Sequence, residues 1–159
     1  MRSNITAGII AGLIAGVVMG IMMTVMQAPT PEGGSIPMMA MVAMVVKSKS
    51  LVVGWLYHLF NSAVIGALFG WFLGSRVTNY GNASGWGAAY GFIWWLLGGL
   101  ILMPLFLGMP AFAPLQMPMM RGTAMASLIG HLIFGVILGV LFLPLRGTAR
   151  TTLGNARHA

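Results

Sequence analysis

Cysteine is absent from the sequence, and the only acidic residue is Glu32. Without cysteine the chain forms no disulfide and offers no thiolate nucleophile, iron–sulfur cluster or Cys-ligated zinc site. One carboxylate cannot make the carboxylate pair of a general acid–base enzyme or an all-oxygen metal cage. We therefore expect no enzymatic activity. Glu32 lies among Pro and Gly residues, and we interpret it as a solvated loop residue.

Charged residues of any kind are also scarce, at 6% of the 159 residues against 58% hydrophobic residues. This composition is typical of a membrane protein, so we expect the chain to be surrounded by a lipid bilayer. Eight lysine and arginine residues give a formal net charge of +7, but they are scattered along the chain. A nucleic-acid groove needs a basic cluster, and we expect no nucleic-acid partner.

Long apolar runs predict four transmembrane helices over residues 5–27, 51–74, 85–108 and 123–143. About 20 apolar residues, rising ~1.5 Å each, cross the ~30 Å hydrocarbon core. Residues 36–46 are apolar but too few to cross, so they predict a short interfacial or re-entrant helix in the first connector. We expect Pro104 to kink the third span, because proline removes a backbone donor. The fold class is thus an all-α integral membrane protein.

The distribution of positive charge predicts the orientation of the chain. Five arginines flank the spans on the side of the two termini, and three basic residues lie on the other side. The first set is Arg2, Arg76, Arg146, Arg150 and Arg157, and the second is Lys47, Lys49 and Arg121. Because cytoplasmic loops carry the excess of Lys and Arg, we expect both termini in the cytoplasm, across a bacterial or archaeal cytoplasmic membrane.

Internal similarity divides the chain into two halves. Gly12 and Gly16 recur as Gly87 and Gly91, and the segment around His58 recurs around His131. We interpret residues 1–76 and 77–147 as two repeats of two helices each, followed by a basic mobile tail over residues 148–159. Repeats with an even number of spans run in the same direction, so a pseudo-two-fold axis along the membrane normal would relate them.

Each repeat carries one histidine inside an apolar span, followed by a ridge of small residues. His58 precedes Ser62 and Gly66 at steps of four, and these recur as His131, Gly135 and Gly139. Ionisable side chains in a membrane span are costly and indicate function. Two imidazoles at one depth, with glycine leaving room beside them, suit the axial ligation of a b-type haem. We list His58, Ser62, Gly66, His131, Gly135 and Gly139 as cofactor-binding candidates, in a protein of membrane electron transfer.

Two other interpretations of these features stay open. Each histidine could be neutral and bond a carbonyl or a nearby hydroxyl, holding helices together. The chain would then be a cofactor-free accessory subunit, whose glycine ridges dock helices of a larger membrane complex or of a homo-oligomer. A third possibility is a small transporter or channel along the axis between the repeats.

The positions of the methionines indicate copper as the substrate of such a transporter. Of the 15 methionines, all but Met1 lie between residues 19 and 44 or between 103 and 125. Thioethers are soft ligands that select Cu(I), and they could pass copper to the histidines. The candidates, weaker than the histidines, are Met38, Met39, Met41, Met44, Met117, Met119 and Met120. Methionine is also a flexible filler for irregular apolar gaps, and this simpler interpretation is preferred at the level of sequence.

Overall fold

The computed structural model describes residues 2–30 and 33–155, with side chains described for residues 3–30 and 33–147. Glu32 and its predicted loop role lie outside the described residues, as do residues 156–159 of the predicted tail. The described chain is predominantly helical, with four helical segments long and apolar enough to cross a membrane. These segments are Ser3–Val25, Leu51–Phe72, Tyr80–Phe106 and Pro118–Gly147. The prediction of an all-α protein with four helices long and apolar enough to span a membrane is confirmed.

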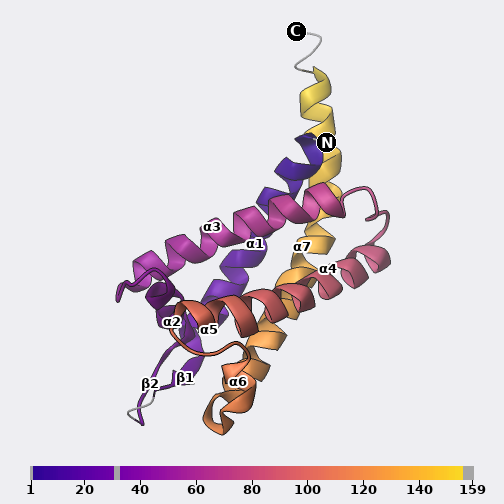
Figure 1. The fold of residues 1–159 in the computed structure, drawn as a ribbon. Helices are drawn as coiled ribbons and strands as arrows, with labels where there is room; N and C mark the ends of the chain where they lie inside the picture. Colours follow the sequence, from indigo (N-terminus) through magenta and orange to yellow (C-terminus); the bar gives the residue numbers. More distant parts are fainter. Residues whose placement is uncertain (1, 31–32, 156–159) are drawn as a thin grey trace.

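Shorter elements connect the spans, as Figure 1 shows. The first half contains α1 (Arg2–Val25), β1 (Gln27–Pro29), β2 (Ser35–Pro37), α2 (Met38–Val45) and α3 (Leu51–Phe72). The second half contains α4 (Tyr80–Trp94), the π-helix η1 (Trp95–Leu102), α5 (Met103–Phe106), α6 (Ala113–Gln116), the 3-10 helix η2 (Pro118–Met120) and α7 (Arg121–Asn155).

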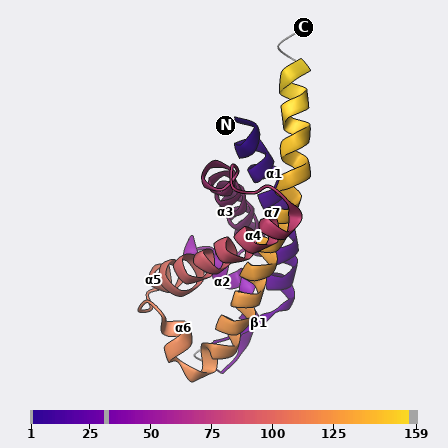
Figure 2. The same cartoon turned by 90° about the vertical axis from the view of Figure 1, so that its right-hand side faces the viewer.

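The four spanning segments pack in the order α3, α1, α7, α4. In Figure 1, β1, β2, α2 and α6 gather at one end of the molecule, opposite the end where α1 begins. We call this the connector end. Figure 2 shows α3 and α5 on the same side of α7. The α1–α7 pair therefore forms the centre, and α3 and the α4–η1–α5 segment flank it.

Glycine determines how closely the helices pack within each pair. A Cβ atom on Gly66 of α3 would collide with the carbonyl of Gly8 on α1, and one on Gly135 of α7 would collide with the carbonyl of Gly87 on α4. Only residues without a Cβ allow this approach of two backbones. The predicted close-packing ridges are thus used inside the chain.

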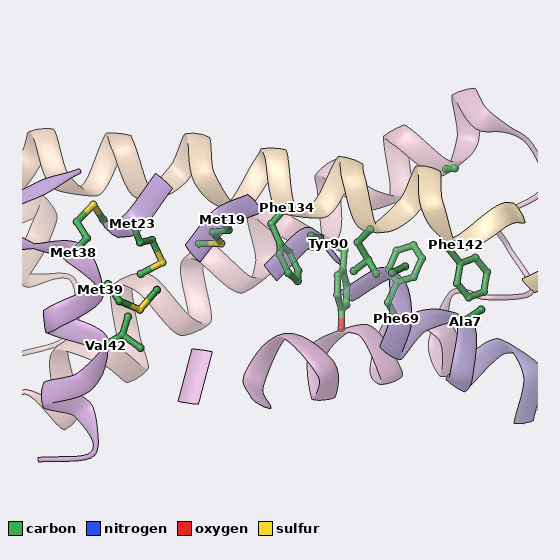
Figure 3. Close-up of a cluster of buried hydrophobic side chains, with 14 of the residues drawn as sticks. Ala7, Met19, Met23, Met38, Met39, Val42, Phe69, Tyr90, Phe134 and Phe142 are labelled. Atoms are coloured by element: carbon green, nitrogen blue, oxygen red, sulfur yellow. The ribbon is translucent and has the colours of Figure 1, made fainter. Parts of the chain in front are cut away.

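Small and aromatic side chains fill the centre of the bundle. Ala7, Ala11 and Ala15 on α1 are fully buried. Figure 3 shows Phe69, Tyr90 and Phe142 close together from three helices, and the Phe69 ring lies 5.2 Å from Tyr90 and 5.5 Å from Phe142 between centroids. Both contacts are edge-to-face, a favourable arrangement of aromatic rings. Tyr90 is the point where α4 reaches α3.

The first connector differs in detail from the sequence prediction. The predicted helix over 36–46 is observed as α2, and the residues before it form an antiparallel pair in which Ala28 faces Ile36. Proline explains the difference, because it disfavours the helical conformation in the residue before it, here Ile36, and Pro37 itself has an extended ψ of 138°. The hairpin therefore replaces the first turn of the predicted helix.

The helix before Pro104 differs from a regular α-helix. Residues 95–102 adopt the wider π-helical form, and the helix then continues as α5 through Pro104. A proline ring blocks the carbonyl four residues earlier, here that of Leu100. That carbonyl accepts a hydrogen bond from the Phe112 N–H at 2.7 Å instead. This hydrogen bond attaches the loop after α5 to the η1 helix.

The last helix is longer than predicted. The predicted tail begins at residue 148, but α7 continues through Pro144 to Asn155. Near this end Arg146 donates from Nη1 to the carbonyls of Gly74 and Val77, at 2.6 and 3.1 Å. Its guanidinium also lies over the Phe142 ring, 5.7 Å from the centroid. Arg146 therefore ties α7 to the connection between α3 and α4.

Candidate functional site

An apolar cavity of about 270 Å³ lies between α3 and the η1–α5 segment, in the half of the bundle nearer the connector end. Residues of every helix from α1 to α7, and of η1 and η2, contribute to its lining, so segments distant in sequence form one site. We call it the histidine cavity, because His58 and His131 both line it. Two residues from separate helices thus line one cavity.

His58 is fixed by a bond between helices. Its Nε2 lies 2.9 Å from the carbonyl oxygen of Gly16 on α1, and the residue is only 9% exposed. Since a carbonyl only accepts, Nε2 carries the hydrogen and donates it. The Trp55 ring meets the imidazole edge-on, at 6.4 Å between centroids. Nδ1 is the ring nitrogen that remains available in the neutral form.

His131 bonds within its own helix instead. Its Nδ1 donates to the carbonyl of Ser127, one turn earlier, at 2.8 Å. The Ser127 hydroxyl lies 3.4 Å from the same nitrogen. In the neutral tautomer that this bond selects, Nε2 keeps its lone pair. Among the described residues nothing hydrogen-bonds to that Nε2, so it is the nitrogen free to take a ligand.

Other polar side chains also line the histidine cavity. Asn61 and Thr123 do so, and neither side chain makes a hydrogen bond to the described part of the chain. Ser62 lines it as well, but its hydroxyl is committed to the carbonyl of His58 at 2.8 Å. Apolar walls with a few unpaired polar groups are typical of small-molecule sites.

The remaining predicted cofactor-binding residues lie elsewhere. Gly66 packs on Gly8, Gly135 on Gly87, and Gly139 on the carbonyl of Ala83. These three glycines do not line the histidine cavity. Their role in the structure is to bring α3 close to α1 and α7 close to α4. Of the predicted set, the cavity thus gathers His58, Ser62 and His131.

The predicted methionines divide between two cavities and the core. Met38, Met41 and Met120 line the histidine cavity, together with Met19, Met23, Met103 and Met109. A second cavity, of about 360 Å³ at the connector end, is lined by Met41, Met44, Met109, Met117, Met119 and Met120. Met39 lines neither cavity and is fully buried. Within the described residues, no three His, Asp or Glu side chains form a group that could hold a metal ion.

Asn61, Thr123 and Ser127 were not predicted as site residues. Helical spacing could have indicated two of them, since Asn61 follows His58 by three residues and Ser127 precedes His131 by four. Thr123 gives no such signal, because its place depends on how the second connector folds. Family models, curated proteins and solved structures were compared with the chain, and none matches it.

Proposed function

We propose that this protein binds a flat lipophilic prosthetic group, haem b, in the histidine cavity and serves membrane electron transfer without catalysing a reaction of its own. The observation that carries the proposal is that His58 and His131, 73 residues apart, line one cavity. Aromatic side chains of Tyr57, Trp94 and Trp95 contribute to its walls. When bound, haem would supply an iron that changes oxidation state.

The two histidines have different roles in this proposal. His131 is the first ligand, since its Nε2 is free while Nδ1–H is held by Ser127. A metal-ligating histidine commonly donates its other N–H to a carbonyl, which fixes the ring and the tautomer. His58 would be the second ligand, through Nδ1, the nitrogen that the bond from Nε2 to the Gly16 carbonyl leaves available. Asn61 and Thr123 offer hydrogen bonds to polar edges of the group.

Two parallel repeats explain why a cavity opens at this place. With the repeat offset, α4 corresponds to α1 and α7 to α3, so the α3–α4 contact is the counterpart of the α1–α7 contact. Ala15 of α1 then corresponds to Tyr90 of α4, and Ala11 to Trp86. Ala11 and Ala15 are fully buried, whereas Tyr90 reaches from α4 to α3 with its long side chain and bonds the Ile65 carbonyl. The proposed symmetry is broken at the histidine cavity.

The proposed orientation puts the connector end outside and both termini in the cytoplasm, across a prokaryotic cytoplasmic membrane. Lys47, Lys49 and Arg121 lie close to the connector end in sequence, after α2 and at the start of α7. Positive side chains there would neutralise the propionates of a haem whose polar edge faces the outer surface. A larger membrane complex or a second copy of the chain would then exchange electrons with it.

Haem titration of the detergent-solubilised protein tests the proposal. We expect saturable uptake of one haem with a shifted Soret band. Gly99→Leu should prevent uptake without removing a ligand, because a side chain there would meet Trp95, Ser127 and His131, with its Cβ 3.8 Å from the imidazole. Gly85→Leu is the matched control, since a Cβ at Gly85 has no atom within 4 Å. A folded wild-type protein that takes up no haem, or equal uptake by Gly99→Leu, would refute the proposal.

A cofactor-free accessory subunit is the second candidate, and one observation favours it. The His58–Gly16 bond joins α3 to α1, which is what a purely structural histidine would do. The ridges formed by Gly8, Gly66, Gly87 and Gly135 are already occupied within the chain. An accessory role would therefore need another docking surface. Co-purification of a larger complex that is unchanged by His58→Ala and His131→Ala together would favour this candidate.

A further inference from the structure

The second cavity, at the connector end, has an unusual chemical lining. Six of the ten residues that line it are methionines: Met41, Met44, Met109, Met117, Met119 and Met120. They come from α2, from the loop after α5 and from the residues around η2. Three separate stretches of chain therefore bring thioethers to one place. We call it the methionine cavity.

The other lining residues supply few atoms that could bind a metal ion in place of the thioether sulfurs. They are Pro29, Thr30, Ile36 and Leu107, and the Thr30 hydroxyl already accepts a hydrogen bond from the Gly34 N–H at 3.2 Å. No carboxylate, imidazole or thiolate group is among the lining residues that the structure describes. Hard cations such as Mg²⁺ and Ca²⁺ need oxygen ligands, and zinc takes Cys, His or carboxylate. A set of thioethers selects Cu(I).

Filling of gaps does not account for three of these methionines. A filler side chain is buried, as fully buried Met39 in the adjacent core is. Met44, Met117 and Met119 are 47%, 38% and 47% exposed, so much of each side chain fills no space within the described chain. Exposed flexible thioethers around a cavity can instead reorient around a bound ion. The net positive charge of the protein also disfavours a divalent ion more than a monovalent one.

The two cavities share part of their walls. Met41, Met109, Met120 and Leu107 line both of them, and Met19, Met23, Met38 and Met103 continue the series in the histidine cavity. Figure 3 shows Met38, Met23 and Met19 following one another from the connector end toward Phe134. Thioethers thus extend from the surface of the connector end to the cavity that holds His131.

We propose that the methionine cavity is a binding site for Cu(I), held by thioether sulfurs of Met44, Met117 and Met119 with Met41, Met109 and Met120 behind them. The site goes beyond the proposed haem function and does not depend on it. Its first three ligands line only the methionine cavity, so they can be changed without touching the residues that line the histidine cavity.

Competition for Cu(I) against a chromogenic chelator, without oxygen, tests the site in the full-length protein. We expect the wild type to withdraw Cu(I), and the triple variant Met44→Leu, Met117→Leu, Met119→Leu to bind it at least about tenfold more weakly. Leucine conserves the apolar volume, so the variant should fold. A triple variant at methionines that line neither cavity, Met22→Leu, Met26→Leu and Met125→Leu, is the control and should bind as the wild type does.

Three results would overturn the proposal: no withdrawal of Cu(I) by the wild type, equal affinity of the first triple variant, or an equal loss in the control variant. Elution as a monodisperse peak and an unchanged thermal midpoint establish that each variant is folded. His58→Ala together with His131→Ala should leave Cu(I) affinity at the methionine cavity within about twofold. The double histidine variant tests haem uptake, and the triple methionine variant tests Cu(I) binding. Either proposal can therefore fail without the other.

Discussion

Tyr90 donates its phenolic hydrogen to the backbone carbonyl of Ile65 at 2.7 Å, from α4 to α3. Its ring also meets Phe69 edge-to-face, at 5.2 Å between centroids. Ile65 itself lines the histidine cavity. Tyr90 thus defines the inner border of the proposed ligand site.

Replacing Tyr90 by phenylalanine should loosen this border while keeping the ring. Loss of one hydrogen bond within a membrane bundle costs about 0.6 kcal/mol on average and up to about 1.7 kcal/mol. We expect a lower free energy of unfolding by an amount in that range, measured by denaturation in mixed micelles. Tyr80→Phe is the control, because Tyr80 is 60% exposed. Equal losses in the two variants would show that the bond to Ile65 does not hold α4 against α3.

Adding a methyl group to the close-packed glycines should separate the helix pairs. Gly66→Ala and Gly135→Ala each put a Cβ against a backbone carbonyl, of Gly8 and Gly87 respectively. Overpacking of this kind costs about 1–3 kcal/mol, and backbone atoms cannot move aside as a side chain would. Thermal unfolding followed by circular dichroism would measure the loss. Gly85→Ala, with open space around the new methyl, should be neutral or slightly stabilising.

The two histidines should differ in their contribution to stability. His58→Ala removes a bond between α3 and α1, so we expect a loss of about 1–2 kcal/mol in the ligand-free protein. His131→Ala removes a bond within one helix turn, whose carbonyl on Ser127 remains available to the helix. We expect a smaller loss there, and chemical denaturation of both variants would compare them. A larger loss in His131→Ala would contradict the expectation that the bond between α3 and α1 contributes more to stability than the bond within α7.

Arg146 should not be replaceable by lysine. Its Nη1 bonds two carbonyls, of Gly74 and Val77, while the guanidinium plane lies over Phe142. An ammonium is a point charge that cannot keep the stacking and the paired bonds together. We expect Arg146→Lys to expose the connection between α3 and α4 to limited proteolysis more than tenfold faster. A cleavage rate equal to that of the wild type would contradict this role.

The spans could be predicted from sequence because they depend on local properties. Hydropathy and length identified all four, although the third begins at Tyr80 and not at residue 85. There Asn79 caps the helix by accepting a hydrogen bond from the Asn82 N–H at 2.9 Å, which starts α4 within a polar stretch of low hydropathy. The sequence contains Asn79, a favoured capping residue, at this position, but a hydropathy average takes no account of capping.

The site was predictable only in part, since packing decides what each residue faces. The histidines were identified because an ionisable group in an apolar span is conspicuous. Gly135 and Gly139 were expected beside a cofactor, but their smallness serves the backbone contact with α4. The different hydrogen bonds of His58 and His131 also follow from tertiary structure, because both lie in similar local sequence.

The most direct test of the central claim is the absorption spectrum of haem-loaded protein with each histidine removed in turn. If both imidazoles serve one cavity, the wild type should give a six-coordinate, low-spin spectrum. His58→Ala should keep haem on His131 but become five-coordinate and high-spin, and His131→Ala should fail to retain it. Identical spectra for the wild type and both variants would contradict the claim that His58 and His131 act on a common ligand.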